Sequence, residues 1–441
     1  MHPFVKKSLA NTSWLMSEKV LVMAANLAVS VMLARSLGPD GFGSLSYLLA
    51  IISMVSPLAA LGLNSIVTRE LINNPERQNQ IIATTVAMRL VGAIAGSAIC
   101  ILIALFGLGL NNLDSQWGLF ILAIGNVFTC FSVLEFWFQA KVAARVVTRM
   151  RLAIVLVFSV FKLLAVIYSV DFIIVIALFA IETMITGIGF ITIFKTEGNI
   201  LKLKYANWTY GLSLLRQSFW LILSGIAAII YLKVDQIMLE QLASSAEVGT
   251  YAVAARMSEV WYFFADAIVI TIFPALLSLK KRGENLKYFN SLQKISDLLF
   301  SLAILLAFSV TVAARPAISL LFGDEYKESA VILQWHIWAA VFVFMRSLVS
   351  KWLIAEQLLK YSLVSHGIGA IINIIANYYL IPYWGGTGAA VATVLSYFTA
   401  SYLAFWISSA TRPIAIVMTK SILLPFSLGY RYWPINKSGF L

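Results

Sequence analysis

Long apolar runs follow one another along this chain, with short polar segments between them. Each run holds about 20 residues, the length that an α-helix needs to cross roughly 30 Å of hydrocarbon. A helix pairs its own backbone N–H and C=O groups in lipid, whereas an isolated strand leaves them unpaired, so every run is predicted to be helical. The pattern predicts about twelve spans, at residues 14–34, 43–63, 81–107, 117–139, 152–170, 172–194, 217–239, 250–278, 296–314, 330–350, 361–381 and 386–408.

The last segment, residues 409–441, departs from this pattern. Arg412, Pro413, Lys420 and Pro425 interrupt its apolar stretch. Charges and prolines at this spacing are more typical of a helix on the membrane surface than of a span. We therefore predict a cytoplasmic or interfacial tail.

Composition and charge agree with a multi-pass membrane protein. Apolar residues make up 61% of the chain and charged residues 12%, which excludes an ordinary soluble domain. The net charge of +12 would suggest nucleic acid as a partner of a soluble protein. Here most Lys and Arg residues lie in the segments on one side of the membrane, before odd-numbered spans and after even-numbered ones. Among the loops on the other side, only three such residues occur: Arg35, Arg315 and Lys327. The positive-inside rule then predicts cytoplasmic termini and no nucleic-acid partner.

A weak internal repeat divides the spans into two halves. Positions 206 residues apart carry the same or similar residues near the first turn of each half, as in Gly43 with Gly249 and Ser44 with Thr250. Six spans separate the repeats, so both halves enter the membrane in the same direction and a pseudo-twofold axis lies along the membrane normal. We predict a six-helix half at 1–205, a second at 206–408, and a central cavity between them.

Charged residues inside the spans are the candidate functional groups. Burying a charge at mid-bilayer costs on the order of 2.5–3.5 kcal/mol, so such residues are expected to face a cavity, a partner or the helix end. The bases are Arg89, Lys162, Lys233, Arg256 and Arg346, and the acids are Glu135, Glu182, Asp235, Glu259 and Asp266.

The eighth predicted span carries three of these charges on one face. Arg256, Glu259 and Asp266 fit within an arc of about 80° at 100° per residue. One interpretation is an intrahelical ion pair between Arg256 and Glu259 that steadies the helix. The other is a role with substrate or protons, and the spacing leaves both open.

Motifs for cofactor or metal chemistry are absent from the sequence. It contains no Walker loop, no dinucleotide fingerprint, no H-E-x-x-H and no Cys/His cluster, so no cofactor, no metal and no enzymatic activity are predicted. The two cysteines, Cys100 and Cys130, fall inside apolar runs. We interpret them as packing residues.

Three segments resemble the polysaccharide-transport branch of the flippase superfamily that also contains the MATE exporters and the lipid II flippases. They are "VMLARSLGPDGFGSLSYLLA" at 31–50, "PLAALGLNSIVTREL" at 57–71 and "LIPYWGGTGAAVATVLSY" at 380–397. The resemblance implies a MATE-like all-α polytopic membrane protein with two six-helix bundles around a central cavity. It also implies a Wzx-type O-antigen flippase of the bacterial inner membrane.

That resemblance implies a substrate and a mechanism. The substrate would be an undecaprenyl-pyrophosphate-linked oligosaccharide that moves to the periplasmic leaflet by alternating access with ion coupling, among membrane lipids and in contact with an O-antigen polymerase and a chain-length regulator. Arg or Lys in the cavity would offset the desolvation of the pyrophosphate. On this hypothesis the five bases named above contact the head group and the five acids couple protons.

Two alternatives stay open from the sequence. One is another member of the same superfamily, a lipid II flippase or a small-molecule exporter. The other is a membrane enzyme of the O-antigen polymerase or ligase type. Such an enzyme is expected to carry a large periplasmic loop, and no outer loop predicted here exceeds about 20 residues.

Overall fold

The computed structural model describes residues 3–107, 109–110 and 112–426, with side chains from residue 17 onward. Within these residues the chain is helical and has no strand, which confirms the predicted fold class of an all-α polytopic membrane protein. The main helices are α1 (Pro3–Ala60), α2 (Asn64–Asn73), α3 (Gln78–Phe106), α4 (Leu113–Val127), α5 (Leu134–Ala140), α6 (Ala144–Ile167), α7 (Phe172–Thr196), α8 (Trp208–Leu242), α9 (Ser245–Glu259), α10 (Tyr262–Lys281), α11 (Asn285–Phe322), α12 (Lys327–His336), α13 (Ala339–Ala355), α14 (Lys360–Ser401) and α15 (Arg412–Ile422).

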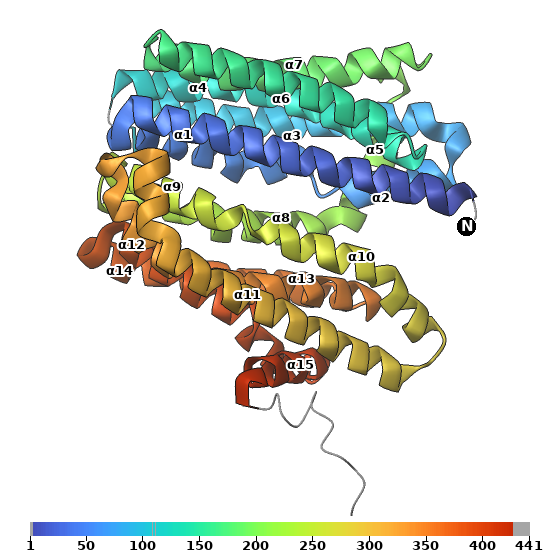
Figure 1. Ribbon diagram of the computed structural model, residues 1–441. Coiled ribbons are helices and arrows are strands. Elements are labelled where there is room, and N and C mark those ends of the chain that lie inside the picture. Colours follow the sequence, from blue (N-terminus) through green and yellow to red (C-terminus); the bar gives the residue numbers. More distant parts are fainter. Residues whose placement is uncertain (1–2, 108, 111, 427–441) are drawn as a thin grey trace, which may run out of the picture.

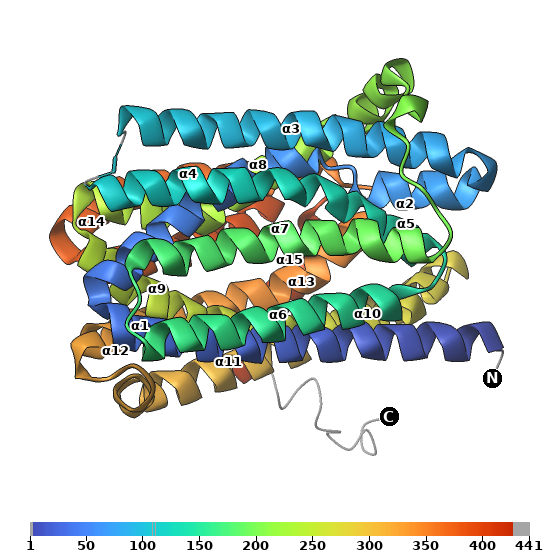
Figure 2. The ribbon, with the colours of Figure 1, turned by 90° about the horizontal axis from the view of Figure 1, so that it is seen from above.

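Helix α1 contains a sharp reversal. Its 58 residues would extend about 87 Å as one straight helix, far more than a bilayer is thick. Gly38 interrupts it with φ of 64°, a left-handed conformation that glycine adopts without a Cβ penalty. In both views the chain runs away from the N-terminus and then returns to the same end of the bundle, where α2 lies (Figures 1 and 2).

Helix α14 reverses in the same way at Gly385, where φ is 51°. The Ser396 hydroxyl donates a hydrogen bond of 3.0 Å to the Gly369 carbonyl, although the two residues are 27 positions apart. In a straight helix they would lie roughly 40 Å apart. The contact therefore requires a helical hairpin.

The reversals account for the number of spans. Nine helices among the described residues are long and apolar enough to cross a membrane, and α12 with α13, bent by 47°, make a tenth span. Because α1 and α14 each supply two spans, the described chain crosses twelve times, as predicted.

The spans form two layers. Helices α1 to α7 make one layer and α8 to α14 the other (Figure 1), and α1 contacts both α8 and α9 between them. We call the end that holds α2 and the start of α1 the α2 end, and the opposite end the α9 end. The residue at which the first half stops, 205, stays a prediction.

The two layers meet backbone to backbone at the α9 end. A Cβ atom on Gly43 would lie 1.7 Å from the Ser245 carbonyl oxygen, and one on Gly249 would lie 2.1 Å from the Pro39 carbonyl oxygen. Under the predicted repeat, which pairs Gly43 with Gly249 and Pro39 with Ser245, each contact is the image of the other. Reciprocal contacts of this kind occur where a twofold axis passes.

Two predicted spans are interrupted. The fourth is divided into α4, a 3₁₀ segment (Phe128–Val133) and α5, and the eighth breaks between α9 and α10 at Val260 and Trp261. Val260 and Trp261 keep right-handed helical dihedrals and Ser245–Lys281 remains one span, with Arg256 on α9 and Asp266 on α10. The single stripe of charges stays a prediction.

The predicted tail begins with a turn and helix α15, which packs on the bundle. Helix α15 has 11 residues, about 16 Å of helix, which is too short for a span. Its Ser421 hydroxyl donates to Asp297 of α11 at 2.6 Å. Residues 427–441 of the tail lie outside the described residues.

Candidate functional site

A cavity of about 550 Å³ lies between α1, α6, α7 and α9. It joins the two layers of the bundle, since α1, α6 and α7 belong to the first layer and α9 to the second (Figure 1). Four predicted site residues line it, two bases and two acids: Lys162, Arg256, Glu182 and Glu259. The other lining residues are Met23, Asn26, Leu27, Val29, Ser30, Phe179 and Val260.

Lys162 and Glu182 form an ion pair between α6 and α7. The Lys162 ammonium group also lies 3.7 Å from the centre of the Phe179 ring, a distance at which the ring attracts a cation. The carboxylate and the ring therefore compensate the positive charge of the buried Lys162 at the wall of the cavity.

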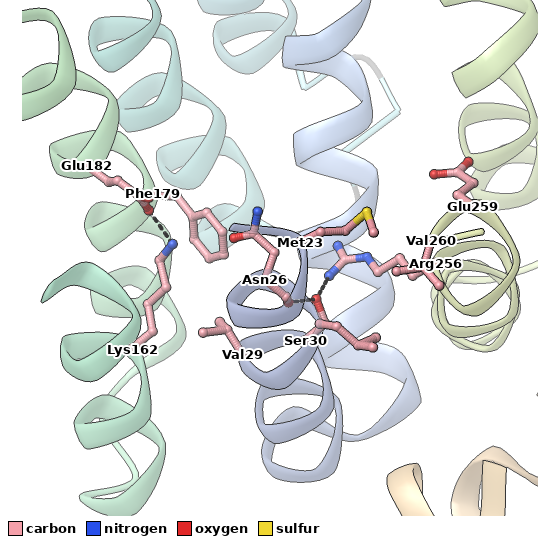
Figure 3. Close-up of a pocket in the computed structure, with 11 residues that line it drawn as sticks. Met23, Asn26, Val29, Ser30, Lys162, Phe179, Glu182, Arg256, Glu259 and Val260 are labelled. Atoms are coloured by element: carbon pink, nitrogen blue, oxygen red, sulfur yellow. Dashed lines mark hydrogen bonds and ion pairs between the residues drawn. The ribbon is translucent and has the colours of Figure 1, made fainter. Parts of the chain in front are cut away.

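Arg256 reaches α1 from the opposite side (Figure 3). Its guanidinium group donates to the Ser30 hydroxyl and lies 4.8 Å from the centre of the Phe42 ring. The predicted ion pair with Glu259 is not formed, because no carboxylate lies within 4.0 Å of Arg256 among the described residues. Glu259 lines the same cavity, with its carboxylate apart from the Arg256 guanidinium group (Figure 3).

Sequence reasoning missed the contribution of α1 to this cavity. Asn26 and Ser30 are four residues apart, so both lie on one face of α1, and the Ser30 hydroxyl also donates to the Asn26 carbonyl at 2.7 Å. The i,i+4 spacing of two polar residues in an apolar span was the available signal. The cavity thus offers two cations with amide and hydroxyl groups between them, the groups that bind phosphate oxygens.

The structure places Arg89, Arg346 and Lys233 outside the cavity lining. Arg89 is buried on α3 and donates to the Ala59 carbonyl at 2.9 Å. Lys233 is half-buried on α8, with no carboxylate within ion-pair distance in the part of the chain that the structure describes.

Arg346 lies in a polar cluster on α13 and α14. It donates to the Ser365 hydroxyl at 2.8 Å, to the Ala400 carbonyl at 3.2 Å and to His366 Nε2 at 3.0 Å. An arginine only donates, so His366 Nε2 is the acceptor. This hydrogen bond joins α13 to α14.

Asp235 is a second buried polar centre, on α8. Its carboxylate is 2% exposed and accepts hydrogen bonds from Tyr251 at 2.6 Å, Asn377 at 2.6 Å and Thr393 at 2.8 Å. All three donors are neutral, so this carboxylate has no cation beside it among the described side chains. Within α14, Asn377 also donates to Asn373 Oδ1 at 3.1 Å.

The remaining two acids have local partners outside the cavity. Glu135 on α5 pairs with Arg151 at 2.5 Å, and Arg151 also pairs with Glu18 at 3.0 Å. Asp266 is exposed on α10 and accepts from the Ser347 hydroxyl at 2.6 Å. The structure thus brings four of the ten predicted site residues together and disperses the other six.

Two family profiles match most of the chain between them. The profile of the polysaccharide biosynthesis protein family matches residues 8–280, and that of the lipid II flippase MurJ family matches residues 147–427. This chain belongs to the polysaccharide biosynthesis protein family. The family stands in the superfamily that also holds MurJ and the MATE transporters, which confirms the resemblance found in the sequence.

Solved structures of that superfamily share the fold. The lipid II flippase MurJ in an inward closed conformation superposes with a TM-score of 0.72 at 14% identity, over 96% of this chain and 94% of that one. An inward-facing multidrug resistance MATE transporter superposes with a TM-score of 0.67 at 14% identity, over 91% of this chain and 96% of that one.

A curated relative is the probable low-salt glycan biosynthesis flippase Agl15 of Haloferax volcanii. It is 24% identical over 195 residues, which are 44% of this chain and 41% of that protein. An uncharacterized membrane protein of Methanocaldococcus jannaschii, MJ1068, is 28% identical over 35% of this chain and 30% of that one. The aligned part therefore spans less than half the length of the curated relatives.

Proposed function

We propose that this polysaccharide biosynthesis protein is a flippase that moves a polyprenyl-pyrophosphate-linked oligosaccharide, an O-antigen or similar repeat unit, from one leaflet to the other. The observation that carries the proposal is the cavity between the layers, where two basic side chains, Lys162 and Arg256, face the same space inside the bundle. A pyrophosphate needs such cations in order to leave water, because an unpaired charge in hydrocarbon is very costly.

The dimensions and the lining suit a head group more than a lipid chain. Polar and charged side chains come from α1, α6, α7 and α9, while exposed apolar residues cover the outer faces of the helices, for example Leu105 and Phe106 on α3. The polyprenyl chain would therefore stay in the bilayer. The two cations would hold the pyrophosphate, with the Asn26 side-chain amide as a further donor.

Movement would follow an alternating-access cycle. Contacts between the layers occur at both ends: Tyr210 donates to Glu70 at 3.2 Å at the α2 end, and Arg35 donates to the Leu321 carbonyl at 2.8 Å at the α9 end. Such small polar contacts can break and reform as one layer rocks against the other, with the cavity at the centre.

We assign ion coupling to Asp235. A buried carboxylate with only neutral donors is costly in the membrane, and a bound proton or monovalent cation would remove that cost. Asp235 lies on α8 and its partners lie on α9 and α14, so neutralising the charge would change how these three helices pack. Glu135, by contrast, has a fixed ionic partner in Arg151.

Orientation and cellular setting complete the proposal. With the Lys and Arg residues gathered at the α2 end, we place both termini in the cytoplasm and the protein in the bacterial inner membrane. The product would pass to a polymerase and its chain-length regulator on the other side.

The first experiment is genetic. Deleting the gene is expected to trap the undecaprenyl-linked repeat unit on the cytoplasmic face, where a periplasmic polymerase cannot reach it. Single repeat units on finished lipid A would instead favour the enzyme alternative, a polymerase or ligase. Trapped lipid II in place of the repeat unit would favour the lipid II flippase.

The second experiment tests the cavity. Arg256→Ala removes a charge-assisted hydrogen-bond donor worth about 1.5–3 kcal/mol, so transport is expected to fall roughly 10- to 100-fold. Surface polysaccharide and the amount of protein in the membrane are measured together. Arg315→Ala, an exposed arginine of α11 outside the cavity, is the control and should transport normally. Normal polysaccharide in the Arg256 variant would remove this residue from the proposed head-group site.

A further inference from the structure

The two cations of the cavity have different partners. Lys162 is held by the carboxylate of Glu182, whereas the described partners of the Arg256 guanidinium group are the Ser30 hydroxyl and the Phe42 ring. An incoming anion can therefore approach Arg256 directly. At Lys162 an incoming anion would have to displace the Glu182 carboxylate.

The burial of the pair indicates which partner can leave. The Lys162 side chain is 4% exposed and the Glu182 side chain 17%. Lys162 also packs on the Phe179 ring, so its ammonium group is fixed from two sides. Glu182 is the member of the pair that faces open space, and it can rotate away from Lys162 on the α7 backbone.

We propose that Glu182 competes with the anionic head group for Lys162, and that binding of the head group drives uptake of a proton by Glu182. This inference rests on the proposed function, since it takes a pyrophosphate as the ligand. A pyrophosphate that bridges Lys162 and Arg256 displaces the Glu182 carboxylate. The displaced carboxylate then has no cation of its own and takes a proton from water.

Among the described residues that line this cavity, the bases are Lys162 and Arg256. The other bases of α6, Arg145, Arg149 and Arg151, lie roughly three or more helical turns before Lys162. Helix α9 supplies Arg256, which the ligand would occupy, and Glu259, which is itself acidic. The segment of α1 that lines the cavity is uncharged. On the other elements packed against α7, the acids are Asp114 in the first turn of α4 and Glu135 of α5, which is paired with Arg151. The 3₁₀ segment between α4 and α5 carries only Cys130 as a titratable group.

The exchange has a consequence for transport. With the ligand absent, Glu182 neutralises Lys162, so the empty cavity does not carry an unpaired lysine through the membrane. With the ligand bound, the protonated Glu182 adds no negative charge against the pyrophosphate. The proton is released when the ligand leaves and Glu182 pairs with Lys162 again. Binding is therefore linked to protons, and affinity must fall as the pH rises.

Calorimetry on the purified full chain tests this inference. Farnesyl pyrophosphate is the probe, titrated in buffers of different ionisation enthalpy. The wild-type protein is expected to take up close to one proton per ligand, and its affinity should fall by up to about tenfold per pH unit above neutrality. The Glu182→Gln variant should bind farnesyl pyrophosphate without taking up this proton. The part of the pH dependence of affinity that comes from Glu182 should be absent. The ligand's own ionisation is common to both titrations.

A matched control separates this site from other ion pairs. Glu284→Gln alters a carboxylate that pairs with Lys287 on the exposed turn before α11, and its proton uptake should equal that of the wild type. Loss of the uptake in Glu259→Gln but not in Glu182→Gln would overturn the proposal.

The remaining outcomes are equally distinct. Tight binding by the wild type without proton uptake overturns the exchange and leaves the flippase proposal standing. Absence of binding by both the wild type and Glu182→Gln counts against the flippase proposal as well. The wild-type titration needs no variant, so a substitution that fails to fold cannot hide the answer.

Discussion

At the scale of single residues, Arg151 links its own helix to two neighbouring helices through ion pairs with two carboxylates. It lies on α6 and pairs with Glu18 of α1 and Glu135 of α5. The Glu18 side chain is 3% exposed and Arg151 is 29% exposed, so the pair with Glu18 is largely shielded from water. A buried carboxylate that loses its cation becomes destabilising.

Replacing Arg151 tests this contribution. Arg151→Met is expected to lower the free energy of unfolding by about 1–3 kcal/mol, less than for a fully buried pair because Arg151 is partly exposed. The midpoint of thermal unfolding in detergent is the measurement. Adding Glu18→Gln to the variant should restore part of the loss, whereas an unchanged midpoint in Arg151→Met would show that the cluster adds no stability.

Asp235 gives a second prediction at this scale. Asp235→Asn is close in size to a protonated carboxyl group and removes the titratable charge, so it should weaken the coupling of transport to the ion gradient. Transport in proteoliposomes is measured with and without an imposed proton or cation gradient. We expect the gradient to accelerate the variant less than the wild type, and the response that remains should be lost when Glu182→Gln is added. A variant that responds as strongly as the wild type would place the coupling of Asp235 elsewhere.

At the scale of helices, the close approach of α1 and α9 depends on two glycines. A Cβ on Gly249 would lie 2.1 Å from the Pro39 carbonyl oxygen, much closer than van der Waals contact. The halves can therefore close at the α9 end only while both positions lack a side chain. At the α2 end the same pair of layers is held by replaceable polar contacts, such as that between Tyr210 and Glu70 at 3.2 Å.

Gly249→Ala should shift the protein toward states that are open at the α9 end. A thiol probe applied from that side should label a cysteine at Asn26, inside the cavity, several-fold faster in the variant than in the parent. Gly367→Ala is the control, because a Cβ there has open space around it. Equal labelling rates in all three proteins would contradict a gate at this contact.

At the scale of the whole molecule, twelve crossings place the start of α1 and the end of α14 on one side of the membrane. The turn between α6 and α7 lies at the α9 end and the segment between α7 and α8 at the α2 end (Figure 2). The two native cysteines are buried, so they leave a low background for labelling.

Accessibility to a membrane-impermeant thiol reagent tests the orientation. In intact cells, a cysteine at Ser169 should react and a cysteine at Glu197 should react only after the membrane is permeabilised. Both positions are exposed on the protein surface, so burial cannot explain a difference. The opposite pattern would reverse the orientation that the positive-inside rule predicts.

Parts of the site could be predicted and parts could not. Lys162, Glu182, Arg256 and Glu259 stand out in the sequence because a charge in an apolar run is rare and costly. The sequence could not show that these four side chains share one cavity, because the ion pair joins α6 to α7 and the cavity also requires α1 and α9. Arg89 has the same sequence signature, yet it binds a carbonyl oxygen on α1.

The sequence by itself determined the membrane as solvent, the helical class, the twelve crossings and a bias of positive charge to one end, because span length, backbone pairing and charge placement act locally along the chain. Only the tertiary structure decided where helices break, as between α9 and α10, and which intramembrane charges share a cavity. Those outcomes depend on contacts between residues far apart in sequence, and the periodicity of one helix carries no information about its partner.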